Sequence, residues 1–137
     1  MRPLAALFAI AASLLAVGLV VQVFLAGLGV FDDPTFFLTH RDTGYTLGLL
    51  ALVVLVLAVI AHAGRAQVGR VALVFLLFIV QSALVGVRAS APAVAALHPL
   101  NGFLILVLSL VIARDAWRMA RTRRPDTAPA VSPPVQA

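Results

Sequence analysis

The sequence contains no cysteine, no lysine and no glutamate, and only 11% of its 137 residues are charged. The absence of cysteine excludes disulfides, thiolate metal sites and covalent attachment of a c-type haem. The low charge leaves too few polar side chains to cover the surface of a soluble domain of this size. Because 63% of the residues are hydrophobic, the composition predicts an integral membrane protein that lies in a lipid bilayer.

Four apolar stretches stand out, at about residues 4–30, 44–63, 71–87 and 95–113. Crossing the ~30 Å of hydrocarbon in a bilayer takes ~20 helical residues. We therefore predict an all-α, integral membrane four-helix bundle within residues 1–120. The first stretch is longer than the apolar region of a signal peptide, so we expect it to be a retained helix.

The arginines predict the orientation of these helices. Eight of the ten lie on one side of the predicted bundle, and only Arg41 and Arg88 lie on the other. The positive-inside rule then places both termini and the loop at 64–70 in the cytoplasm. The net charge of +5 sits at the ends of apolar segments, which favours membrane topology over nucleic-acid binding. We predict no nucleic-acid partner.

Residue usage also predicts the source membrane and a tail. Arginine as the sole long basic residue, with abundant Ala, Val and Leu, is typical of a GC-rich bacterial genome, which indicates a bacterial inner membrane.

Residues 121–137 are rich in Pro, Ala and Ser without an apolar period, so we predict a disordered cytoplasmic tail.

The two halves of the chain carry the same motif. Residues 21–27 and 80–86 both read V-Q-x-x-L-x-G, and each is followed by P-x5-H and H-x3-G-aromatic. Apolar composition alone does not readily align Gln, Gly, Pro, His and Gly in this order. We predict two tandem helical hairpins, at about 4–63 and 71–118, related by a parallel pseudo-two-fold axis along the membrane normal.

This repeat predicts one polar layer inside the membrane. His40 and His98 each follow a proline by six residues, which is ~9 Å along a helix. Gln22 and Gln81 fall at a comparable depth in the first and third helices. Polar side chains at membrane depth are costly, so they usually face the bundle interior and mark function. Asp33 before Pro34 and, more loosely, Ser90 before Pro92 are expected to cap the two helices.

Two histidines on facing helices of a bundle are a natural axial pair for a haem b. We predict that His40 and His98 ligate its iron. Gly44 and Gly102, one turn after each histidine, would admit the edge of the macrocycle. We predict that Gln22 or Gln81 accepts the second ring N–H of each histidine. Arg41 is expected to pair with a haem propionate. Asn101 is expected to contact the ligand residues without touching the iron. Zinc or copper is disfavoured because two histidines without Cys, Asp or Glu nearby are too few ligands.

Other polar residues are given structural interpretations. His62 has no equivalent in the second half, and we expect it at the membrane interface. Asp115, with Arg114 and Arg118, is expected at an exposed inner helix end. Gly18 and Gly48 are expected to allow close helix packing.

With these residues in view, "THRDTG" at 39–44 and "LHPLNG" at 97–102 resemble the second and fourth helices of one half of haem A synthase. The chain also resembles a family of small uncharacterised bacterial four-helix membrane proteins with the same H-x3-G pair. The resemblance runs to about Arg118 and implies a four-helix bundle with bis-histidine haem ligation. Haem A synthases usually carry E-x-x-H-R, where this chain has Phe37, so their oxidation activity is not implied. Pairing of two chains as a homodimer would imitate the full synthase.

These observations predict a b-type haem protein for electron transfer or haem handling, beside a respiratory or quinone-linked partner. We name no catalytic residue. A second hypothesis is a cofactor-free assembly factor or small structural subunit, in which the polar layer only fixes helix packing. A small-molecule transporter is weaker, because the spans carry almost no charge and no broken helix is expected.

Overall fold

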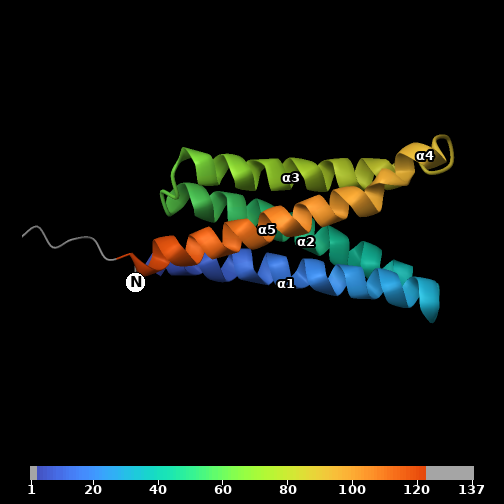
Figure 1. Cartoon of the computed structure of the whole chain (residues 1–137), viewed down its shortest axis with the longest axis horizontal. Helices are drawn as coiled ribbons and strands as arrows, with labels where there is room; N and C mark the ends of the chain where they lie inside the picture. Colours follow the sequence, from blue (N-terminus) through green and yellow to red (C-terminus); the bar gives the residue numbers. More distant parts are fainter. Residues whose placement is uncertain (1–2, 123–137) are drawn as a thin grey trace, which may run out of the picture.

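The computed structural model describes residues 3–122, and all the regular structure in this range is helical. The helices are α1 (Pro3–Phe31), α2 (Phe36–Ile60), α3 (Arg65–Gly86), the short α4 (Pro92–Ala95) and α5 (Leu97–Arg121). Figure 1 shows them side by side along one long axis, with α4 and α5 following one another in the same span. The predicted all-α architecture is confirmed.

Four helical segments are long and apolar enough to cross a membrane, as the sequence predicts. They extend beyond the apolar stretches: α2 begins at Phe36, α3 at Arg65, and α5 ends only at Arg121. Hydropathy marks the part of a helix that lies in lipid, whereas the polar ends of these helices are also helical. Residues 123–137 of the predicted tail lie outside the described residues.

The turn before α2 differs in detail from the predicted cap. The α-helix begins at Phe36 rather than at Pro34, and the cap residue, Thr35, makes no side-chain cap bond. Asp33 still stabilises the turn, because its Oδ1 accepts a hydrogen bond from the Thr35 backbone N–H at 2.8 Å. This bond favours the charged carboxylate and lowers the pKa of Asp33 below its usual value.

The fourth span is interrupted near its start, which the sequence analysis did not expect. Helix α4 ends at Ala95, and α5 begins at Leu97 after one intervening residue, Ala96. Pro99 explains the interruption, since it has no N–H to donate to the carbonyl of Ala95 four residues earlier. The cap before α4 is Ala91, without a side-chain bond, so the expected capping role of Ser90 is wrong.

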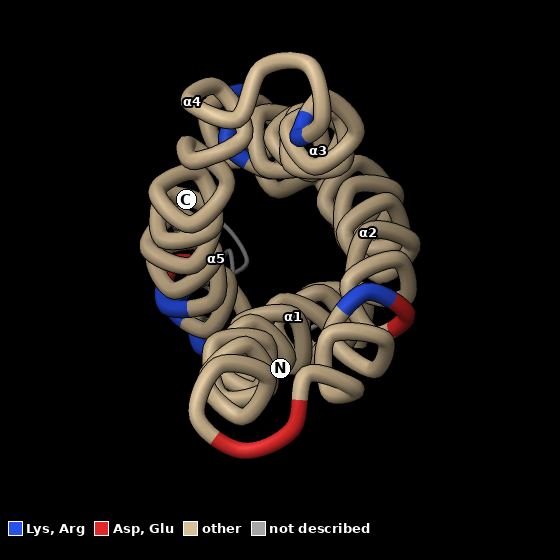
Figure 2. The backbone as a smooth tube through the Cα atoms, turned by 90° about the vertical axis from the view of Figure 1, so that its right-hand side faces the viewer, with Lys and Arg blue, Asp and Glu red and all other residues tan. Residues whose placement is uncertain are grey.

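The four spans form a ring rather than a mutually contacting cluster. Helix α1 packs against α2 and α5, and α3 packs against the same two neighbours. Within the described residues, the backbones of the diagonal pairs α1–α3 and α2–α5 do not come into contact. Figure 2 shows this ring along the bundle axis. Residues on α2 and α5 can therefore face one another across the bundle interior.

One end of the bundle is closely packed and the other is open. The buried apolar side chains of α2 begin at Leu47, those of α5 begin at Ile105, and those of α3 are Val71 and Val74. All of these, with the buried stretch of α1 from Ala5 to Leu19, lie toward the end at which α1 begins and α5 ends. We call this the termini end and the opposite one the histidine end. Polar contacts replace apolar packing at the histidine end.

The seam between α1 and α5 includes a polar bond within the packed region. The indole Nε1–H of Trp117 donates to Ser13 Oγ at 2.9 Å. Ser13 Oγ in turn donates to the carbonyl of Ala9 at 2.8 Å. This short chain of bonds fixes the rotation of α5 relative to α1.

His62 lies in the turn after α2, where it is exposed. Its backbone has φ 54°, which is the left-handed conformation. The residue that adopts this conformation after the end of a helix is usually a glycine. The N–H of Ala63 completes the turn by donating to the carbonyl of Ala58 at 3.0 Å. His62 is therefore a turn residue at the termini end, remote from the other two histidines.

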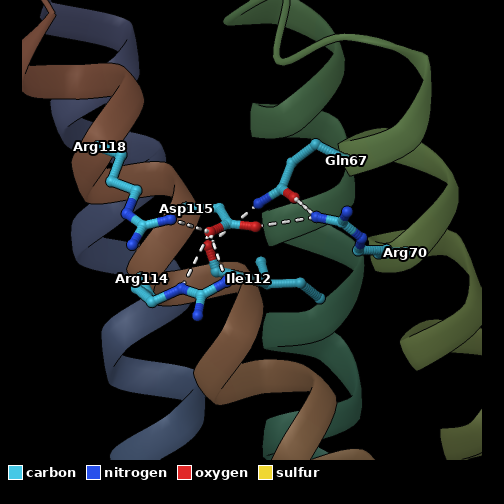
Figure 3. A network of polar contacts seen from close by, with 6 residues as sticks. All are labelled: Gln67, Arg70, Ile112, Arg114, Asp115 and Arg118. Atoms are coloured by element: carbon cyan, nitrogen blue, oxygen red, sulfur yellow. Dashed lines mark hydrogen bonds and ion pairs between the residues drawn. The ribbon is translucent and has the colours of Figure 1, made fainter.

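Asp115 is the centre of an ion-pair network at the termini end (Figure 3). Its carboxylate pairs with Arg70 of α3 at 2.9 Å and with Arg114 of its own helix at 3.0 Å. Arg70 also donates to Gln67, which in turn donates to the carbonyl of Ile112 at 3.0 Å. The expected exposure holds for Arg114 and Arg118. Asp115 differs, because it joins α3 to α5 and its side chain is only 24% exposed.

We expect Asp115→Asn to lower the free energy of unfolding by about 1 kcal/mol, because the arginines around it then repel one another without a counter-charge. The matched control is Asp42→Asn, since Asp42 pairs only with its exposed neighbour Arg41. Thermal unfolding in detergent, followed by circular dichroism, measures both variants. Equal transitions for the two would show that the network does not hold α3 to α5.

Candidate functional site

His40 and His98 meet across the interior of the bundle at its histidine end. Their ring centroids lie 6.2 Å apart, and the ring planes are inclined at 62°. The two residues belong to α2 and α5, which are diagonal in the ring. Both side chains are partly buried. The structure thus brings together the two residues that the sequence predicts as a ligand pair.

The His40 ring is oriented by the backbone of α1. Nδ1 of His40 lies 3.0 Å from the carbonyl oxygen of Gln22. A carbonyl only accepts hydrogen bonds, so the proton of the neutral ring is on Nδ1 and the lone pair is on Nε2. The Gln22 side chain donates back, from Nε2 to the carbonyl of His40 at 3.0 Å. The predicted partner residue is present, but its backbone rather than its amide accepts the ring N–H.

The His98 ring is held in the same way by α3. Nδ1 of His98 lies 3.2 Å from the carbonyl oxygen of Gln81, which again places the ring proton on Nδ1. Here the side-chain amide differs, because Gln81 Nε2 lies 3.2 Å from His98 Nε2. The N–H of the Gln81 amide therefore donates to the lone pair on Nε2 of His98.

Asn101 fixes the orientation of the Gln81 amide. Its Nδ2 donates to Gln81 Oε1 at 2.6 Å and to the carbonyl of Leu77 at 3.0 Å. Because Gln81 Oε1 accepts from Asn101, the Gln81 amide nitrogen is directed to His98. The predicted role for Asn101 was an outer contact to a cofactor, whereas here it acts through Gln81.

Gly44 and Gly102 lie beside the two glutamine side chains, and the fit is tight only at Gly102. A Cβ on Gly44 would lie 3.7 Å from Gln22 Nε2, and one on Gly102 would lie 3.2 Å from Gln81 Nε2. Each glycine therefore lies under the glutamine that orients the neighbouring histidine. Sequence reasoning placed the glycines beside a cofactor and missed this contact. The matched spacing of Gln, His and Gly in the two halves was the signal that could have revealed it.

Arg41 and Phe37 have surroundings that the sequence did not indicate. Arg41 pairs with Asp42 at 2.8 Å, and both side chains are more than half exposed. Phe37 packs against the backbone of α1, where a Cβ on Gly29 would lie 2.9 Å from its ring. Phe37 thus provides a contact between α2 and α1.

An open apolar groove runs between α2 and α3, and neither histidine lines it. Several of its lining side chains, including Tyr45 and Leu49, are exposed on the outer face of the bundle. The volume of the groove is about 400 Å³, which is within the usual range for small-molecule pockets. The groove reaches Gly44, one helical turn from His40. Its lining residues are Gly44, Tyr45, Gly48, Leu49, Leu52, Phe75, Phe78, Ile79 and Ser82.

Residues 3–122 contain no group of three or more His, Cys, Asp or Glu side chains placed to hold a metal ion. The histidine pair by itself offers two ring nitrogens to a metal. Such a set suits a metal whose remaining positions are filled by a macrocycle.

A protein-family model described as a family of unknown function (DUF6220) matches residues 22–90, about half of the chain. The match begins at Gln22 and includes His40 and Gln81, whereas His98 and Asn101 lie beyond it. No curated protein and no solved structure matches the chain.

Proposed function

This chain belongs to the DUF6220 family of unknown function, and we propose that it is a membrane protein that binds one b-type haem between His40 and His98. The observation that supports this most directly is the spacing of the two rings. A metal–imidazole bond is about 2.0–2.1 Å, so a metal between two imidazoles places their ring centres roughly 6.3 Å apart. The centroids of His40 and His98 are 6.2 Å apart.

The hydrogen bonds of the rings support the same proposal. Metal-binding histidines usually donate their second ring N–H to a carboxylate, a backbone carbonyl or water, which fixes the tautomer and raises the basicity of the ligand nitrogen. The carbonyls of Gln22 and Gln81 accept the Nδ1–H of His40 and His98 in this way. Both imidazoles therefore carry their lone pair on Nε2, the nitrogen through which they would ligate.

The surroundings suit a large apolar cofactor. The groove at Gly44 is lined mainly by apolar and aromatic side chains of α2 and α3, which places apolar surroundings within one helical turn of His40. When bound, a haem supplies one-electron redox chemistry. The chain contributes two neutral nitrogen ligands, an apolar environment and carbonyls that hold the ring protons. Electron transfer or haem handling beside a respiratory or quinone-linked partner is the role that we propose.

The proposed architecture is a tandem repeat of two hairpins. The matching bonds from His40 to Gln22 and from His98 to Gln81 support a parallel duplication, and the arginine distribution supports cytoplasmic termini. The resemblance of "THRDTG" and "LHPLNG" to one half of haem A synthase points to the same ligand pair. We do not propose haem oxidation, since Phe37 is packed on Gly29 where that family has its glutamate.

One observation favours a second candidate, a cofactor-free assembly factor or structural subunit. The amides of Gln22, Gln81 and Asn101 already bond to α2, α5 and α3 through protein partners alone. Interhelical bonds of this kind stabilise membrane bundles without a cofactor. In that case, the polar layer would fix helix packing and the protein would be colourless.

A reduced-minus-oxidised visible spectrum of the detergent-purified protein separates the two candidates. We expect sharp b-type bands, with a pyridine haemochrome assay giving about one haem per chain. Expression in medium with added haem ensures that a shortage of haem in the cells does not leave the protein without pigment. A colourless protein under that condition would contradict the haem proposal and leave the packing role.

A further inference from the structure

The two candidate ligands differ in what contacts their Nε2 atoms. Gln81 Nε2 donates to His98 Nε2 at 3.2 Å. The corresponding amide of the first half, that of Gln22, donates to the His40 backbone carbonyl instead. Among the described residues, Nε2 of His40 has no hydrogen-bond partner. One ligand lone pair is therefore free and the other is occupied by an amide.

A single difference between the halves accounts for this. Asn101 lies three residues after His98 and anchors the Gln81 amide through Oε1 at 2.6 Å. Three residues after His40 the chain has Thr43, which has no amide to orient Gln22. The Asn101 side chain is itself tied to α3 through the carbonyl of Leu77. The amide on His98 is thus a held contact within a chain of three polar side chains.

We propose that His40 is the permanent haem ligand and His98 an exchangeable one, because the Gln81–Asn101 pair competes for His98 Nε2. This inference rests on the proposed haem site and refines it. Ligation by His98 requires the Gln81 amide to move away, whereas ligation by His40 displaces nothing. If haem is bound, release of His98 to the Gln81 amide would leave a coordination position for a small neutral ligand, while His40 would continue to hold the group.

Carbon monoxide is the probe that tests this inference. The dithionite-reduced holoprotein is titrated with carbon monoxide, and the shift of the Soret band gives the apparent Kd. A net hydrogen bond contributes about 1–1.4 kcal/mol, so removing the competing amide should strengthen His98 ligation about 5- to 10-fold. Gln81→Leu should therefore raise the apparent Kd for carbon monoxide about 5- to 10-fold, with the backbone carbonyl of residue 81 still holding the ring.

Gln22→Leu is the matched comparison, since its amide contacts no ring nitrogen. We expect its apparent Kd to stay within about twofold of wild type. Asn101→Ala supplies a second variant, which frees the Gln81 amide from its anchor and should raise the Kd in the same direction. His98→Ala should keep its haem in a high-spin form that binds carbon monoxide.

The outcomes separate the two levels of the proposal. A protein without haem would overturn both the haem site and the exchange. A haem protein that binds no carbon monoxide, or one in which Gln81→Leu and Gln22→Leu behave alike, would overturn the exchange alone. Loss of haem in His98→Ala would likewise make both histidines permanent ligands.

Discussion

Replacement of His40 by alanine is expected to remove the haem from the purified protein. His40 is the candidate ligand whose Nε2 is free, and its Nδ1–H is already fixed by the Gln22 carbonyl at 3.0 Å. Loss of a residue that merely orients a ligand costs about 10- to 100-fold in affinity, so loss of the ligand itself should exceed about 100-fold. The absorbance ratio of the Soret band to the protein band, measured on equal amounts of protein, reports the effect.

The matched control is His62→Ala. His62 lies in the exposed turn after α2, so this variant should keep wild-type pigment. Helix content of the His40→Ala protein should also be unchanged, because the packed core lies at the termini end. A His40→Ala protein with full haem would refute the assignment of His40, and one that fails to fold would make the polar layer structural.

Replacement of Gly18 by leucine should have the largest effect on stability. A Cβ at Gly18 would overlap the side chain of Leu47, which is only 6% exposed in the α1–α2 interface. The leucine has to separate the two helices or displace Leu47 into other buried side chains. Overpacking usually costs about 1–3 kcal/mol, and we expect at least about 3 kcal/mol for a side chain of this size in a helix contact built on a small residue.

Gly27→Leu is the control on the same helix. A Cβ at Gly27 meets no atom within 4 Å, and leucine favours helix by up to about 1 kcal/mol over glycine. Thermal unfolding in detergent should therefore show a strong loss for Gly18→Leu and none for Gly27→Leu. Similar losses of stability in both variants would mean that the glycines of α1 are needed for the flexibility of the helix and not for a close contact with Leu47.

The sequence predicted what depends on composition and local spacing. Four spans follow from the apolar runs, and the close contact at Gly18 is confirmed by its approach to Leu47. The juxtaposition of His40 and His98 was predictable because two matched motifs on alternate helices come to the same depth. These features need no knowledge of how each helix is rotated.

Other features depend on that rotation and were missed. Asp115 and Arg70 are 45 residues apart, and their pairing requires α3 and α5 to present particular faces to one another. The acceptance of both ring N–H groups by backbone carbonyls is a matter of helix approach, which residue types do not encode. The replacement of Thr43 by Asn101 at the equivalent position was visible, but its effect on Gln81 needed the side-chain geometry.

The seam between α1 and α5 has a consequence for biosynthesis. Trp117 and Ser13, which bond across it, are 104 residues apart in the chain, so α1 is synthesised well before its partner α5. Until α5 is inserted, α1, α2 and α3 form an incomplete ring that is open to the bilayer along one side. If haem binds as proposed, this interval would give it a lateral route from the bilayer to His40 before α5 closes the ring.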